Sequence, residues 1–154
     1  MNTPTQLRIH LWHAPFDPLA LLAQWQRDLI AAAEPPGAAE SLFIGRARGS
    51  TADGAALASL ELEHYPGMTE KQLQGLALDC CQRHRVRSCL VHHRIGHVLP
   101  GEAIVLVAIG ADRRGPAQRC CQDLLEALKH EAPFWKREWR ADGGSAWITG
   151  NTPL

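Results

Sequence analysis

Neither sign of charge is in surplus in this sequence. Its 154 residues contain 16 Lys and Arg against 16 Asp and Glu, so the formal net charge at pH 7 is zero. Binding to nucleic acid or to an anionic membrane by bulk electrostatics needs a basic surplus, so we expect neither partner. No apolar stretch approaches the ~18 residues of a membrane span, and the N-terminus lacks a signal-peptide pattern. These absences predict a cytoplasmic protein.

The spacing of the cysteines argues against two kinds of site. The five cysteines form an odd set with two adjacent pairs and no Cys-x-x-Cys spacing: Cys80, Cys81, Cys89, Cys120 and Cys121. A disulfide framework or a zinc site is therefore not expected. Both adjacent pairs fall on the apolar stripe of a predicted helix, where a reduced cysteine behaves as a small hydrophobe. We predict that the cysteines pack in the core.

The common signatures of enzymes and cofactor sites are missing as well. There is no dinucleotide-binding glycine motif, no phosphate-binding P-loop, no His-Glu-x-x-His and no Gly-x-Ser-x-Gly. We interpret His92, His93 and His97 as solvated or hydrogen-bonded residues, since neighbours on a strand point to opposite faces. Glu61 and Glu63 share one face of a predicted strand and indicate a half-exposed sheet. No metal and no cofactor are predicted.

Hydrophobic periodicity predicts one α+β domain over residues 1–154. A first helix is expected after Asp17 as N-cap and Pro18 as first residue, and a second after a capping box of Thr69 and Gln72. A third should begin near Pro116 and stop before Pro133. Strands are expected over 7–12, 39–48, 57–65, 86–95, 103–110, 134–139 and 146–149, with a hairpin joining 86–95 to 103–110. Gly45 within the second of them indicates a bulge or a close backbone approach.

Basic residues beside turns are the feature that suggests a site. Arg113 and Arg114 stand between an apolar strand and the start of a helix, where free backbone N–H groups also attract anions. Lys129 falls on the border between the buried and solvent faces of the third helix. The residues alone predict an anion pocket and go no further.

Four segments, in this order, carry a resemblance to a known family. They are FIGRAR (43–48), LEHYPGMTEKQL (62–73), HRIGHVLPGEAIVLVAIG (93–110) and LKHEAPFWKRE (128–138). With them the chain resembles the MoaE family, the large catalytic subunit of molybdopterin synthase, over about residues 38–139. The resemblance implies an α/β hammerhead fold with an additional β-subdomain.

The same resemblance implies an activity and its partners. Family members convert cyclic pyranopterin monophosphate to molybdopterin by transferring two sulfur atoms, without a cofactor. The sulfur arrives as a thiocarboxylate on the C-terminal Gly-Gly of a small ubiquitin-like subunit. Two large subunits form a central homodimer with one small subunit at each end, giving a heterotetramer. We therefore expect a sulfurtransferase of molybdenum cofactor biosynthesis.

The family's site positions fall on seven residues of this chain. The lysines of its LK-x-x-APFWK motif are Lys129 and Lys136, which the resemblance makes the catalytic residues. The substrate-binding positions correspond to Phe43, Arg48, Leu125, Arg113 and Arg114, the last two contributed across the dimer interface. Since the partner carries the sulfur, none of the chain's cysteines is required to react.

Two departures from the family keep alternatives open. Where relatives have His followed by Arg, this chain has Arg113 before Arg114, so a permanent cation replaces a titratable group. Some relatives carry a further basic residue where Asn151 stands here. One alternative is a catalytically impaired paralogue that serves as a binding or regulatory module for the small subunit. Another is a non-enzymatic protein that binds a phosphorylated small molecule in the same pocket.

Overall fold

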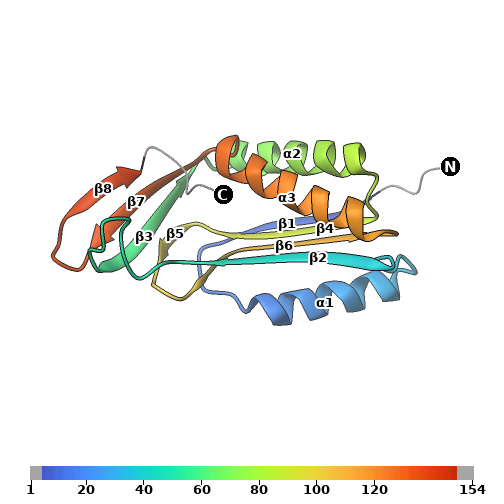
Figure 1. Ribbon diagram of the computed structural model, residues 1–154, viewed down its shortest axis with the longest axis horizontal. Coiled ribbons are helices and arrows are strands. Elements are labelled where there is room, and N and C mark those ends of the chain that lie inside the picture. Colours follow the sequence, from blue (N-terminus) through green and yellow to red (C-terminus); the bar gives the residue numbers. More distant parts are fainter. Residues whose placement is uncertain (1–4, 149–154) are drawn as a thin grey trace.

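Two four-stranded sheets organise the chain, and helices cover both faces of the first (Figure 1). The computed structural model describes residues 5–148. Strand order is β1-β4-β6-β2 in the first sheet and β5-β3-β7-β8 in the second. The elements are β1 Gln6–Trp12, α1 Pro18–Ala31, β2 Ala39–Arg46, β3 Leu57–His64, α2 Met68–His84, β4 Ser88–Arg94, β5 Gly96–Val98, β6 Ala103–Ala111, α3 Arg114–His130, β7 Phe134–Arg140 and β8 Ser145–Ile148. The predicted α+β class is confirmed.

The first sheet separates two hydrophobic cores. On one face α1 packs Leu22, Trp25 and Leu29 against Leu90 and Leu106 of the sheet. On the other face α2 and α3 lie side by side and cover the larger core (Figure 1). Side chains alternate along β4, so that its odd-numbered residues from position 89 face α2 and α3. None of the helices within residues 5–148 has the length and apolar character needed to cross a membrane.

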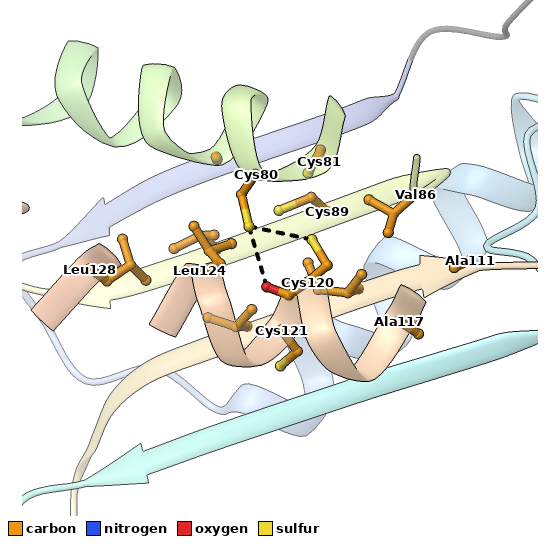
Figure 2. Packing of buried hydrophobic residues seen from close by; sticks show 14 of the residues in the cluster. Cys80, Cys81, Val86, Cys89, Ala111, Ala117, Cys120, Cys121, Leu124 and Leu128 are labelled. Carbon is orange, nitrogen blue, oxygen red and sulfur yellow. Dashed lines mark hydrogen bonds between the residues drawn. The ribbon is translucent and has the colours of Figure 1, made fainter. Parts of the chain in front are cut away.

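All five cysteines lie in the larger core, as predicted (Figure 2). The Sγ atom of Cys80 on α2 lies 3.7 Å from the Sγ atom of Cys120 on α3, and it donates to the Cys120 carbonyl at 3.5 Å. The hydrogen bond to Cys120 and burial raise the pKa of the Cys80 thiol, and burial raises that of Cys121. These thiols act as packing groups between the helices and the sheet.

The N-terminal cap of α1 was predicted correctly, and that of α2 was not. Asp17 caps α1 as predicted, since its carboxylate accepts hydrogen bonds from the N–H groups of Leu19 and Ala20. The predicted capping box of α2 is wrong. The N-cap is Gly67, two residues before Thr69, so the helix begins at Met68. The N–H of Gly67 donates to Glu70 Oε2 at 2.6 Å, and glycine adopts the φ of +84° found at this position.

Two further boundaries differ from the prediction. Helix α3 was expected to begin near Pro116 and begins two residues earlier, at Arg114. Pro116 is tolerated in the first turn because an N–H at that position has no partner within the helix. The connection between β4 and β6 is not a simple hairpin. The chain turns at Gly96, whose φ is +77°, and forms β5, which pairs with β3 in the second sheet. The predicted last strand ended at Thr149, which lies outside the described residues.

Candidate functional site

Two lysines mark the junction between the helical layer and the second sheet. Lys129 is exposed in the last turn of α3, and Lys136 is half-buried on β7. The turn between them is held by two backbone hydrogen bonds, from Ala132 N–H to the Ala127 carbonyl and from Phe134 N–H to the Ala132 carbonyl. This turn redirects the chain from helix to strand and fixes both lysines at one place in the fold.

The surroundings of Lys136 disfavour its charged form. Burial lowers the pKa of this ammonium group, and the positive charge of Lys129 lowers it further. An amine with a lowered pKa gives up and takes back a proton more readily at neutral pH than an ordinary lysine does. The pair therefore combines an exposed basic residue with a partly buried group suited to proton transfer.

His93 belongs to the same region, although no functional role was predicted for it. Its ring stacks on Phe134 with a centroid distance of 4.1 Å and an interplanar angle of 8°, and only 7% of the residue is exposed. Burial lowers the pKa of His93 to about 4, and Lys136 acts in the same direction. The Nδ1–H donates to the Arg94 carbonyl at 2.7 Å, since a carbonyl can only accept. The ring is thus a neutral neighbour of Lys136.

The two apolar site candidates lie on different elements. Leu125 lies one turn before Lys129 on α3, and Phe43 lies on β2; both are half-buried and pack against the larger core. The predicted bulge occurs between Gly45 and Arg46. A Cβ at position 45 would lie 3.1 Å from Cε1 of Phe43, so the glycine makes room for the phenylalanine ring.

Arg48 is exposed and lies two residues after the end of β2. The preceding Ala47 is buried and packs with Leu62, which is the cross-strand neighbour of Lys136 on β7. After it, Gly49 accepts a hydrogen bond from Leu57 N–H at 3.0 Å. The segment that carries Arg48 is therefore attached to the second sheet, which also carries Lys136.

Arg113 and Arg114 lie at the other end of α3. With a rise of about 1.5 Å per residue, Arg114 is about 22 Å along the helix axis from Lys129. Both arginines are exposed and line a separate cavity of about 540 Å³ with Asp112 and Pro116. A single chain thus does not bring these arginines to the lysines, and it presents two basic sites at opposite ends of one helix.

The remaining titratable candidates make structural contacts. His92 is buried and its Nδ1 accepts a hydrogen bond from Trp12 Nε1 at 2.8 Å, so like His93 it is hydrogen-bonded and not solvated. Glu61 Oε1 accepts from Trp139 Nε1 at 3.0 Å, which ties β3 to β7. Among residues 5–148, no group of three or more His, Cys, Asp or Glu side chains is arranged to hold a metal ion.

Comparison with known proteins relates this geometry to a family. The family model described as MoaE protein matches residues 13–131, which is most of the chain. The chain belongs to the MoaE family. Among the curated members, each named molybdopterin synthase catalytic subunit, that of Haemophilus ducreyi is 38% identical over 91% of this chain and 87% of its own length. That of Ralstonia nicotianae is 42% identical over 77% of this chain, which spans 66% of that relative.

Solved MoaE structures agree with the fold. The MoaE protein from Burkholderia ambifaria superposes with a TM-score of 0.70 at 38% identity, covering 94% of this chain and 88% of the other. Molybdopterin synthase from Staphylococcus aureus superposes with a TM-score of 0.74 at 25% identity, covering 95% and 97%. The hammerhead fold with an added β-subdomain, expected from the resemblance, is confirmed: the second sheet is that subdomain.

Proposed function

We propose that this chain is the catalytic subunit of a molybdopterin synthase. It is a sulfurtransferase of molybdenum cofactor biosynthesis and converts cyclic pyranopterin monophosphate to molybdopterin. One observation carries the proposal: a MoaE chain retains both motif lysines, which lie close enough, on α3 and β7, for the charge of Lys129 to lower the pKa of Lys136. An impaired paralogue is not favoured, since the family members it matches are named as catalytic subunits.

The chemistry follows from the charges. The substrate phosphate and the thiocarboxylate of the small subunit are both anions, and Arg48, Lys129 and Lys136 supply cations for them. The thiocarboxylate sulfur attacks a substrate carbon that bears an oxygen substituent, the C–O bond at that carbon breaks and the oxygen group leaves, so that the sulfur joins the substrate to the tail as a thioester. Water then attacks the acyl carbon, the acyl C–S bond breaks, sulfur stays on the substrate, and the tail leaves as a carboxylate. The N–H groups of Lys129 and Lys136 donate hydrogen bonds to the oxyanion that forms during this hydrolysis. Lys136 also takes up and returns the proton that is transferred in this step.

Arg113 and Arg114 enter this scheme through a second copy of the chain. They lie too far along α3 from Lys129 to hold the same small substrate, because a hydrogen bond spans only about 3 Å. In a homodimer, the arginines of one copy complete the site that contains the lysines of the other. A small ubiquitin-like subunit inserts its C-terminal tail at each such site, which gives the heterotetramer.

A single-turnover assay tests the proposal. The purified chain is mixed with thiocarboxylated small subunit and cyclic pyranopterin monophosphate, and molybdopterin is detected after oxidation to its fluorescent derivative. We expect product from the wild type, none from Lys129→Ala, and wild-type yield from Lys71→Ala, which removes an exposed lysine on α2. If the wild type binds the small subunit but forms no molybdopterin, the result would favour the impaired paralogue. Product formed without a thiocarboxylated partner would exclude this sulfur transfer.

A further inference from the structure

Arg94 is the most deeply buried charged residue described, and the proposed reaction does not use it. Only 2% of it is exposed, at the point where β4 ends and the chain crosses to the second sheet. Its Nη2 donates to the His97 carbonyl at 2.7 Å, and its Nη1 lies 3.6 Å from Glu102 Oε1. Its Nε and Nη1 make no hydrogen bond within residues 5–148. A buried guanidinium needs a compensating charge, and Glu102 provides it.

Glu102 connects this buried cation to the segment that carries Arg48. Its Oε1 accepts a hydrogen bond from Leu99 N–H at 2.6 Å, which closes the turn before β6. Its backbone carbonyl accepts from Ala47 N–H at 2.9 Å, and Gly101 N–H of the same turn donates to the Ala47 carbonyl, also at 2.9 Å. Both backbone groups of Ala47 are therefore bound to the turn that Glu102 closes.

We propose that Arg94 and Glu102 are positioning residues that hold Arg48 at the substrate-binding site. Arg94 orients the Glu102 carboxylate, Glu102 closes the 99–102 turn, and this turn fixes Ala47. Arg48 is exposed and follows Ala47 directly, so the backbone hydrogen bonds of buried Ala47 determine where the backbone of Arg48 lies. The inference rests on the proposed function, because it assigns Arg48 to an anionic substrate.

Two measurements on purified wild type, Arg94→Met, Arg94→Lys and Glu102→Gln test the proposal. Arg83→Met is the matched control, because Arg83 pairs with Asp79 on the surface of α2. In amide hydrogen exchange, we expect Ala47, Leu99 and Gly101 to exchange about tenfold faster in Arg94→Met and Glu102→Gln, with core amides unchanged. In the sulfur-transfer assay, the KM for the pterin substrate should rise about tenfold while kcat changes little, with Arg94→Lys in between.

The outcomes separate this inference from the proposed function. Faster exchange at the three amides with an unchanged KM would overturn the positioning role, as would a fall in kcat alone. A wild type without turnover would overturn the proposed function instead. Unchanged amide hydrogen exchange at these positions in the variants would overturn the link from Arg94 to Ala47, whether or not the wild type turns over. If Arg94→Met fails to fold, Arg94→Lys decides, because it keeps the buried charge and loses the guanidinium geometry.

Discussion

Mixed dimers offer the sharpest test of how the two ends of α3 are used. Lys129 and Arg114 are about 22 Å apart along the helix axis, so in the proposed dimer each site takes one of them from each copy. Lys129→Ala and Arg114→Ala homodimers should both be inactive, because each lacks one group at both sites. A heterodimer of the two variants has one site with both groups intact and one site with neither.

The expected magnitude follows from that count. Co-expression with two different affinity tags allows the heterodimer to be purified away from both homodimers. In the single-turnover assay it should give about half of the wild-type yield per dimer, because a two-fold interface generates two equivalent sites.

A second heterodimer serves as control for this experiment. Lys129→Ala combined with Lys136→Ala should stay inactive, because both lysines lie at the same junction of one chain and neither site is then complete. If the Lys129→Ala and Arg114→Ala heterodimer were as inactive as its parents, the arginines would not serve the partner's lysines. Activity in the control heterodimer would show that the two lysines act in different sites.

Three further predictions concern catalysis, acid stability and packing. Lys136→Ala and Lys129→Ala should each abolish turnover. The free energy of unfolding from urea melts should change by no more than about 0.5 kcal/mol in Lys129→Ala, because the side chain is exposed. Unfolding of that variant would refute the catalytic assignment. Folding lowers the pKa of His93 from 6.5 to about 4. The contribution of the neutral ring to the free energy of unfolding is therefore complete above pH 6.5 and is lost as the pH falls toward 4. The loss should approach about 3 kcal/mol, and His93→Phe should flatten the profile of unfolding free energy against pH; an equally steep profile would refute this. Gly110→Ala should cost about 3 kcal/mol or more, because its Cβ would clash with the α1–β2 connection. Gly49→Ala, with no atom within 4 Å of the added Cβ, should be neutral in the same melts, and equal costs would refute the packing argument.

Local sequence signals predicted the parts of the fold that short-range physics decides. The cap at Asp17, the bulge at Gly45 and the buried cysteines all follow from neighbouring residues or from hydrophobic periodicity. Strand β5 was missed because three residues that leave one sheet for another have no periodic pattern of their own. The start of α2 was missed because a glycine at positive φ replaced the expected side-chain cap.

The candidate site was less accessible to sequence reasoning than the fold. Lys129 and Lys136 came from resemblance, since a basic residue at a helix end is ordinarily only a favourable partner of the helix dipole. The stack of His93 on Phe134 joins residues 41 positions apart on two different sheets, which no local pattern encodes. Arg94 looked like an ordinary strand residue, and its burial depends on the crossing of the chain from β4 to β5.

The placement of the cysteines has a consequence for how this chain would handle a reactive sulfur donor. Each of the five thiols is enclosed between helices and sheet, and the raised pKa values of Cys80, Cys81, Cys120 and Cys121 leave little thiolate to act as nucleophile at these positions. In the proposed reaction, a thioester near Lys136 would therefore meet no internal thiol that competes for the acyl group. The acyl group of the carrier tail would then pass to water, and no acyl-cysteine would accumulate on this chain.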